Sequence, residues 1–219
     1  MTIIDNMLFD GPAKAMHLLV LAHGAGAPMD SPFMNVFAAG LGRQKIRVAR
    51  FEFSYMQRRR AEGTKRPPDR GPKLEQCWRE VVSELRGILP KGGKLIIGGK
   101  SMGGRIASMV AADDATKEGA VDVDGVVCLG YPFHPQGRPG KTRTEHLATL
   151  MTPTLIVQGT RDALGTFDDV AAYDLSAAIQ FCWMEDGDHS FKPRKASGRS
   201  EAQNWEEGIA AVGDFVKSL

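Results

Sequence analysis

Cysteine is scarce in this sequence, and the few cysteines lack the spacing of a metal site or a disulfide framework. The chain has 219 residues and only three cysteines, Cys77, Cys128 and Cys182, which lie far apart and form no CxxC or Cys/His pattern. Their odd number also argues against complete pairing within the chain. We therefore expect buried free thiols, no bound metal and a reducing compartment.

Long hydrophobic runs and a large charge imbalance are also missing. The opening segment MTIIDNMLFDGP has no basic stretch, and the longest apolar run near it, Leu18 to Ala22, is far below the ~18 residues of a membrane span. We expect a cytoplasmic protein with no membrane contact. The formal net charge of +2 is too small to indicate that the chain as a whole binds nucleic acid.

Short apolar runs are present, and they alternate with segments of helical periodicity. The runs are His17 to Ala22, Ile46 to Phe51, Lys94 to Ile97, Gly125 to Leu129, Thr154 to Val157 and Ile179 to Met184. Such alternation is typical of an α/β protein with a mostly parallel sheet covered by helices on both faces. With 42% hydrophobic residues, the chain is suited to a single α/β domain spanning residues 1–219.

The spacing of apolar residues also predicts several helices. From Leu74 to Leu89, apolar side chains repeat every three or four residues until Pro90, which indicates an amphipathic helix. A second helix is expected directly after Ser101, and a third at the C-terminus with Trp205 and Val216 on its apolar face. The segment KTRTEHLATLM, residues 141–151, has the composition of a further crossover helix.

The segment LIIGGKSMGGR, residues 95–105, fits two motifs that predict different chemistry. It contains Gly-Lys-Ser, which ends a phosphate-binding P-loop, but the first glycine of a P-loop would have to stand at Lys94, inside a predicted strand. It also contains Gly-x-Ser-x-Gly between a strand and a helix, a turn that projects its serine at a strained backbone angle. We interpret Ser101 as a nucleophile, the alternative being a glycine-rich turn without chemistry.

Two downstream turns supply candidate partners for Ser101. Serine hydrolases built on a parallel sheet order their triad as serine, acid and histidine, with the last two after late strands. Asp162 lies in PTLIVQGTRDALG, and His189 lies in DGDHSF after the final run. Asp186 and Asp188 are alternative acids, but their closeness to His189 in sequence favours a role in its turn. Each residue alone is more often a turn residue, whereas the order of all three favours a triad.

An oxyanion hole needs two backbone N–H groups beside the nucleophile. The N-terminus of the helix after Ser101 offers the amide of Met102. The segment HGAGA offers the amide of Ala25, or that of Gly26 as a second choice, because small residues permit close approach. His23 precedes Ser101 in the chain, the wrong order for the base, and we expect it to hydrogen-bond within its loop.

Four ordered motifs, HGAGA, GGKSMGGR, GYPFHP and VQGTRD, make this sequence similar to the α/β-hydrolase superfamily. More narrowly, it resembles a group within the dienelactone-hydrolase-like branch, over nearly the whole chain from Leu18 onward. The resemblance implies an α/β-hydrolase fold with Ser101, Asp162 and His189 as the triad. Dienelactone hydrolases proper carry cysteine at the Ser101 position, so their cyclic lactone substrate is not implied. The group also includes proteins that serve mainly as parts of larger assemblies.

These residues predict a serine hydrolase of carboxylesterase type that acts on a small acyl substrate without a metal or organic cofactor. His23, Tyr131, Phe133 and His134 are candidates to line its pocket, although a packed or solvated histidine is an equal interpretation of His134. Residues 130–152 are too few to hold both a crossover and a large cap domain.

The alternative is an interaction module that keeps the fold without useful turnover. Its support is the basic segment QRRRAEGTKRPPDRGPK, residues 57–73, in which seven basic residues face only Glu62 and Asp69. Such a run is most often a solvated loop, but it also suits docking of an acidic protein or nucleic-acid phosphate. The sequence defines neither the acyl and leaving groups nor the oligomeric state.

Overall fold

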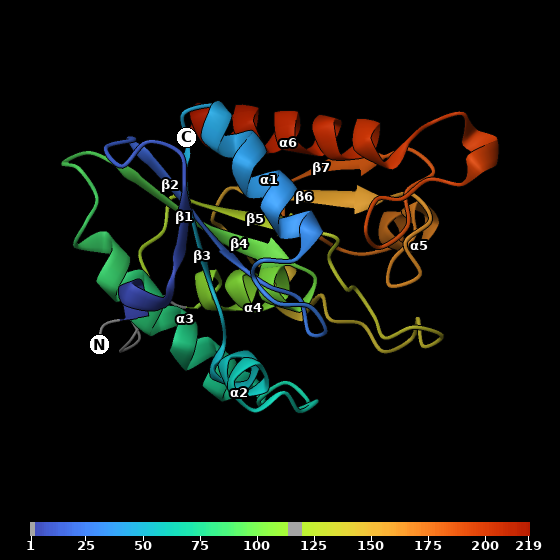
Figure 1. Ribbon diagram of the computed structural model, residues 1–219. Coiled ribbons are helices and arrows are strands. Elements are labelled where there is room, and N and C mark those ends of the chain that lie inside the picture. Colours follow the sequence, from blue (N-terminus) through green and yellow to red (C-terminus); the bar gives the residue numbers. More distant parts are fainter. Residues whose placement is uncertain (1–2, 114–119) are drawn as a thin grey trace.

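A seven-stranded sheet forms the centre of the computed structural model, which describes residues 3–113 and 120–219 (Figure 1). The strand order is β1-β3-β2-β4-β5-β6-β7, and only β1 is antiparallel to its neighbour. The strands are β1 (Leu8–Asp10), β2 (His17–Ala22), β3 (Arg47–Phe51), β4 (Lys94–Lys100), β5 (Gly125–Leu129), β6 (Thr154–Gly159) and β7 (Ile179–Met184). All six apolar runs are therefore strands, as the sequence predicts. The short edge strand β1 was not predicted.

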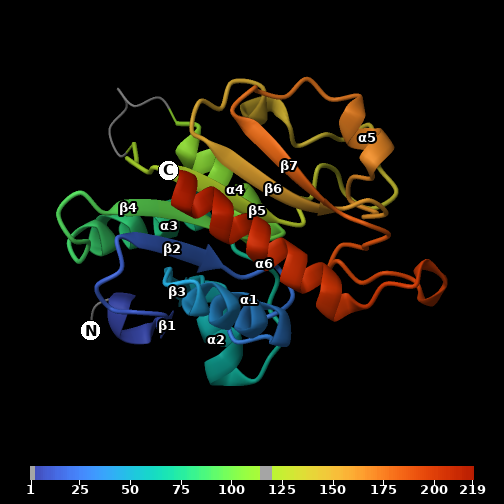
Figure 2. The same cartoon turned by 90° about the horizontal axis from the view of Figure 1, so that it is seen from above.

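Helices cover both faces of the sheet. Figures 1 and 2 show α1 (Pro32–Arg43) and α6 (Glu201–Ser218) on one face, and α3 (Gly71–Arg86) and α4 (Met102–Ala111) on the other. Two shorter helices, α2 (Ser54–Glu62) and α5 (Phe167–Ala171), lie in connections. Three single 3-10 turns are η1 (Ile3–Asn6), η2 (Glu145–Leu147) and η3 (Lys195–Ser197). None of the helices within the described ranges is long and apolar enough to cross a membrane.

The central strands β2, β4, β5 and β6 are buried along almost their whole length because they pack on two sides, whereas the edge strands β1 and β7 are partly exposed. In β2, Leu18 and Val20 belong to the core beneath α3 and α4, whereas Leu19 and Leu21 belong to the core beneath α1 and α6. Successive side chains of a strand point to opposite faces, so a sheet covered on both faces leaves no position for polar alternation. This double packing holds the strand ends, and the turns that follow them, in a fixed arrangement.

Two connections differ from the sequence-based expectation. Residues 141–151 form no α-helix and contain only the 3-10 turn Glu145–Leu147, so the predicted crossover helix is wrong. Three of these eleven positions are threonines and the preceding residues carry Pro135, Gly137 and Pro139, all of which disfavour a helix. No cap domain interrupts this connection, whose residues are all described.

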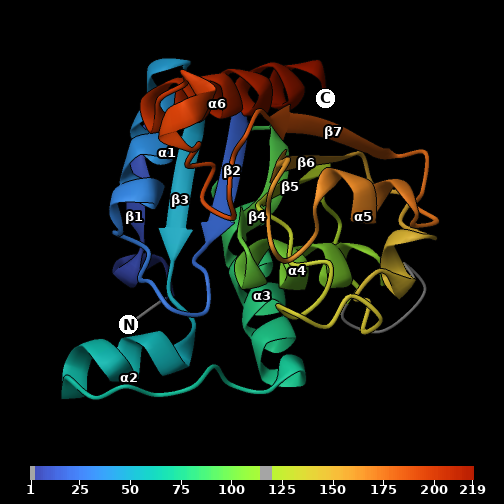
Figure 3. The same cartoon turned by 90° about the vertical axis from the view of Figure 1, so that its right-hand side faces the viewer.

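The basic segment 57–73 is a solvated loop only in its middle part, residues 63–70, because its two ends belong to helices α2 and α3. Its first part belongs to α2, which ends at Gly63 in a left-handed conformation with φ 68°. Tyr55 and Met56 are buried and fix this helix beyond the C-terminal end of β3, as Figure 3 shows. The cysteine expectation is correct only in part: all three thiols are free, but Cys77 and Cys182 are half-buried and only Cys128 is fully buried.

Candidate active site

Ser101 occupies the sharp turn between β4 and α4. Its backbone angles, φ 51° and ψ −115°, lie in a region that costs a non-glycine residue on the order of 1–3 kcal/mol. The backbone of this turn packs directly against the end of β2 and leaves no room for a side chain there. A Cβ atom on Gly103 would lie 2.4 Å from the carbonyl oxygen of Ala22. Two glycine-tight contacts therefore surround the serine, since a Cβ on Gly99 would similarly lie 2.2 Å from the same oxygen. The strained turn places the Ser101 hydroxyl at the C-terminal ends of the parallel strands.

His189 and Asp162 meet Ser101 at these strand ends in one chain of hydrogen bonds. The Ser101 Oγ lies 2.8 Å from His189 Nε2, and His189 Nδ1 lies 2.7 Å from Asp162 Oδ2. Since a carboxylate only accepts, Nδ1 carries the proton of a neutral imidazole, and Nε2 is left to accept from the serine hydroxyl. The structure thus brings together the three predicted residues in an arrangement suited to proton transfer from Ser101.

The Asp162 carboxylate is completely buried, and two further hydrogen-bond donors besides His189 satisfy its oxygens. Gln158 Nε2 donates to Oδ2 at 2.9 Å, and the backbone N–H of Leu164 donates to Oδ1 at 2.9 Å. Gln158 also accepts the backbone N–H of Tyr131 at 2.7 Å. A buried charge is tolerable when it is paired and hydrogen-bonded in this way. Gln158, which the sequence-based prediction missed, therefore orients the acid from the end of β6, the strand that leads to Asp162.

The two alternative acids have structural partners elsewhere. Asp186 forms ion pairs with Arg161 and Arg194, and the hydrogen bonds from Arg194 lower the pKa of Asp186 to about 2. Asp188 accepts the backbone N–H groups of Ser190 and Lys192 and so closes the turn that carries the histidine. Both aspartates thus shape the histidine turn, and Asp162 contacts the imidazole.

The Ala25 amide is oriented by two buried side chains. His23 Nδ1 lies 2.7 Å from the carbonyl oxygen of Gly24, and the backbone N–H of Phe53 donates to His23 Nε2 at 3.2 Å. This pairing places the proton of the ring on Nδ1, consistent with burial lowering the pKa of His23. Since the Gly24 carbonyl and the Ala25 N–H belong to one planar peptide, holding the oxygen also fixes the N–H in the opposite direction. Tyr55 holds the following peptide by donating to the Ala25 carbonyl oxygen at 3.0 Å.

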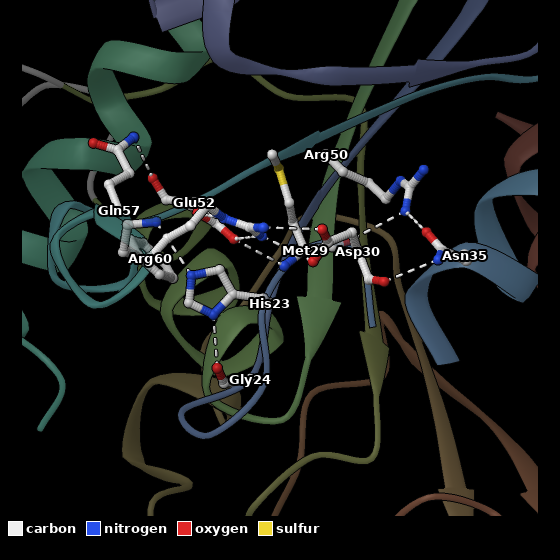
Figure 4. A network of polar contacts seen from close by, with 10 residues as sticks. His23, Gly24, Met29, Asp30, Asn35, Arg50, Glu52, Gln57 and Arg60 are labelled. Atoms are coloured by element: carbon white, nitrogen blue, oxygen red, sulfur yellow. Dashed lines mark hydrogen bonds and ion pairs between the residues drawn. The ribbon is translucent and has the colours of Figure 1, made fainter. Parts of the chain in front are cut away.

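Charged residues fix the rest of the loop that follows Ala25 (Figure 4). The buried Glu52 accepts the backbone N–H of Met29 at 3.4 Å and the Arg60 guanidinium at 2.7 Å. Arg50 donates to the carbonyl oxygen of Met29 at 3.0 Å, and Arg60 also pairs with Asp30 at 2.8 Å. The loop is therefore attached to both β3 and α2. Within residues 3–113 and 120–219 we find no protein acceptor for the amides of Ala25 or Met102.

A family model for the alpha/beta hydrolase domain matches residues 15–217. The chain belongs to this alpha/beta hydrolase family. Its fold is similar to that of an alpha-beta serine hydrolase homologue from Coxiella burnetii, with a TM-score of 0.70, 18% identity, and coverage of 94% of this chain and 90% of the other.

Two further alpha/beta hydrolase structures share the fold. An α/β serine hydrolase without lid from Xanthomonas campestris has a TM-score of 0.65 and 20% identity, covering 94% of this chain and 88% of the other. A dienelactone hydrolase from Anabaena variabilis has a TM-score of 0.66 and 18% identity, covering 97% of this chain and 88% of the other. At these identities the likeness establishes the fold, and the chemistry has to be argued from the residues of this chain.

An open cleft of about 430 Å³ lies beside Ser101 in this alpha/beta hydrolase, and we call it the nucleophile cleft. It is lined by Ala25, Pro68, Asp69, Gly71, Leu74, Ser101, Met102, Arg105, Ile106, Pro132, Pro135, Arg143 and Leu164. Ser101 and both predicted oxyanion donors thus share one cavity. Part of its wall comes from the connection between α2 and α3, so the basic segment contributes apolar as well as charged residues to the cleft.

The four candidate pocket residues do not line the nucleophile cleft, and His134 takes the packed state that the sequence left open as an equal interpretation. Tyr131 and Phe133 are 0% exposed and pack in the core beneath α3 and α4. His134 is also buried, with Nδ1 3.0 Å from the carbonyl oxygen of Pro135 and Nε2 3.5 Å from Asp169. His23 is 0% exposed and acts through the loop, as described above. The GYPFHP motif therefore contributes to the cleft through its prolines.

Lys100 holds the backbone of His189 in this hydrolase, a role that the sequence analysis did not predict. Its Nζ donates to the carbonyl oxygen of His189 at 2.5 Å and lies 5.4 Å and 5.9 Å from the ring centroids of Phe33 and Phe191. Burial lowers the pKa of the Lys100 ammonium to about 8. Part of the side chain reaches the surface, but its charged end lies between the two rings and the histidine turn.

Proposed function

We propose that this alpha/beta hydrolase is a serine hydrolase that cleaves carboxylic esters or related small acyl substrates. The observation that carries the proposal is the continuous hydrogen-bonded chain from Ser101 through His189 to the buried Asp162. These hydrogen bonds begin at Ser101, which lies in a strained strand-to-helix turn. The turn is next to two backbone amides, of Ala25 and Met102, that lack protein acceptors among the described residues. A packed histidine with no catalytic role requires neither the strain nor the open cleft.

The proposed reaction uses these groups in sequence. His189 Nε2 takes the proton of Ser101 as Oγ forms a bond to the substrate carbonyl carbon, and Asp162 stabilises the resulting imidazolium. The amides of Ala25 and Met102 hold the negative oxygen of the tetrahedral intermediate. His189 then gives its proton to the leaving alcohol oxygen as the carbon–oxygen bond breaks. Water attacks the acyl-serine by the same route, releasing the acid and restoring Ser101.

Labelling with a fluorophosphonate probe tests the proposal directly. We expect the wild-type protein to be labelled and Ser101→Ala to lose the label, while Ser218→Ala, at an exposed position on α6, keeps it. Labelling that persists undiminished in Ser101→Ala would refute the assignment of the nucleophile. A folded wild-type protein that never labels would instead support the alternative of an interaction module.

The ion pairs of the basic segment weaken that alternative. Arg58 and Lys73 both pair with Asp69, Arg66 pairs with Glu62, and Arg60 pairs with Asp30 and Glu52. These contacts neutralise much of the charge that a docking surface for an acidic protein or nucleic acid would use. The residues that pair with Arg60 lie before the basic segment in the sequence, so their contribution is visible only in the fold.

The size of the nucleophile cleft favours short acyl chains. The cleft is open, holds about 430 Å³ and has no cap over it in the fully described connection from β5 to β6. Each further methylene in an open cleft stays partly in water and gains little of the ~0.8 kcal/mol of full burial. We expect kcat/KM across p-nitrophenyl esters to peak at short acyl chains. A rise that continues past octanoate would contradict this model of the cleft.

A further inference from the structure

Two arginines, Arg105 and Arg143, line the nucleophile cleft together with Ser101. Arg105 lies on α4 one turn after the serine, and its backbone N–H donates to the Ser101 carbonyl oxygen at 3.0 Å. Arg143 comes from the connection between β5 and β6. Two arginines from separate elements therefore line the cavity that contains the nucleophile.

Neither guanidinium has an acidic partner among the residues that the structure describes. Arg143 Nη1 donates only weakly, to the carbonyl oxygen of Pro132 at 3.4 Å, and no hydrogen bond of the Arg105 side chain to the described protein is found. The Nε atom of Arg105 is buried without a partner. A buried donor left unsatisfied is destabilising, and more so when it is charged. The arrangement is costly unless an anionic group completes it.

The surroundings do not supply that anion. Among the described residues that line the cleft, Asp69 alone carries a carboxylate. Its Oδ1 pairs with Arg58 at 2.9 Å and Lys73 at 3.4 Å, and it forms no ion pair with either cleft arginine, although its Oδ2 is buried without a partner. His146, which packs nearby, is uncharged at neutral pH because burial, followed by the Arg105 charge, lowers its pKa to about 4. Burial and the charge of Arg105 also lower the pKa of Arg143, as expected for two cations that share a site.

The position of His189 indicates which part of a substrate would meet the arginines. His189 does not line the nucleophile cleft but a neighbouring depression of about 420 Å³, which shares Leu164 with it. The leaving oxygen has to lie beside His189, from which it receives its proton. The leaving group therefore extends toward the histidine, and the acyl chain extends into the cleft that holds the arginines.

We propose that Arg105 and Arg143 form an anion-binding subsite, and that the preferred substrate is a short acyl ester whose acyl part ends in a carboxylate. This inference rests on the proposed hydrolase function and names its substrate class. Guanidinium groups suit a carboxylate because their planar N–H donors match its two oxygens. The apolar walls, from Met102, Ile106 and Leu74, contact the methylenes between the scissile carbonyl and the anion.

Hydrolysis of a matched pair of substrates tests the subsite. Mono-4-nitrophenyl glutarate carries the free carboxylate, and its methyl ester has nearly the same shape without the charge. We expect kcat/KM of the wild-type protein to be at least about tenfold higher for the acid, because hydrogen bonds between charged groups are stronger than those between neutral groups. The preference should fall about tenfold in Arg105→Gln and in Arg143→Gln. It should remain in Arg138→Gln, which removes an exposed cation of the same connection.

Two further measurements distinguish a carboxylate subsite from a general effect of positive charge near the cleft. Arg105→Lys keeps a cation without the planar fork, so we expect an intermediate preference and a normal circular dichroism spectrum. Free glutarate should inhibit the wild-type enzyme competitively and inhibit the two glutamine variants at least about tenfold less. Equal rates on both substrates, with Ser101 still labelled by a fluorophosphonate, would overturn the subsite and leave the hydrolase intact. An equal loss in Arg138→Gln would also overturn it, whereas absence of both labelling and turnover would refute the proposed function.

Discussion

Replacing Lys100 with methionine removes a desolvated ammonium group from beneath His189, and we expect this change to alter stability in a pH-dependent way. The pKa of Lys100 falls from 10.5 to about 8 because of burial. At 1.36 kcal/mol per unit, this difference corresponds to about 3 kcal/mol as an upper bound. Methionine matches the length of the lysine stem and carries no charge, so the variant lacks this term.

The sign of the effect follows from proton binding in the folded and unfolded states. Below about pH 8, Lys100 is protonated in both states, and the folded protein bears the full cost of burying the charge. Between about pH 8 and 10.5 the unfolded state binds more protons, so this contribution makes the wild-type protein more stable as pH rises. The free energy of unfolding of Lys100→Met relative to wild type should therefore be most favourable at pH 7 and decline by up to about 3 kcal/mol by pH 10.5.

Chemical denaturation at a series of pH values measures this difference, and subtracting the two proteins cancels the titration of all other groups. Lys91→Met, at an exposed position before β4, is the matched control and should show no such trend. A flat difference between Lys100→Met and wild type over pH 7 to 10.5 would refute the reasoning. The variant also loses the hydrogen bond to the His189 carbonyl oxygen, so we expect kcat on a neutral ester to fall about tenfold even where stability increases.

Four other substitutions probe the site and its surroundings. Asp162→Asn should lower kcat by several powers of ten, because the acid fixes the tautomer of its histidine, whereas Asp186→Asn should lower it far less; the reverse ranking would move the acid to the histidine turn. Tyr55→Phe removes the hydroxyl that holds the Ala25 carbonyl, and we expect about a tenfold loss in kcat with little change in KM, so an unchanged kcat would remove this positioning role. Burial lowers the pKa of His146 from 6.5 to about 4 in the folded state. Its contribution to the free energy of unfolding is therefore complete above pH 6.5 and falls by up to about 3 kcal/mol as the pH drops toward 4. Denaturation of His146→Asn should show a weaker dependence on acid than wild type, and equal dependence would contradict this.

The strands and the three site residues could be predicted because their signals are local. A strand covered on both faces is a continuous apolar run, and the turn at Ser101 requires glycines at fixed spacing, so both can be recognised within a few residues. The proposed roles of Asp162 and His189 follow from chain order and element type. Their hydrogen bonds in the structure agree with this placement.

What the sequence could not predict depends on contacts between distant segments. The run of basic residues in α2 looks like a solvated loop in the sequence because few nearby acids balance its charge. The acids that pair with Arg60 are Asp30 and Glu52, which lie outside α2. Tyr131 and Phe133 follow a central strand at the correct edge of the sheet, but the direction of their side chains depends on packing against the helices. The support of His189 by Lys100 spans 89 positions and has no local signature.

The walls of the nucleophile cleft and the groups at its base come from different parts of the chain. Ser101, Asp162 and His189 each follow a strand of the central sheet, whereas Pro68 and Arg143 come from connections that contribute no strand to the sheet. Connections tolerate sequence change better than packed strands do. Substrate preference in this fold is therefore separable from the proposed chemistry: substitutions at cleft-lining positions of these connections, such as Pro68 and Arg143, should alter selectivity and leave the reaction the same. Directed evolution toward new acyl esters should accordingly accumulate its substitutions in these two connections.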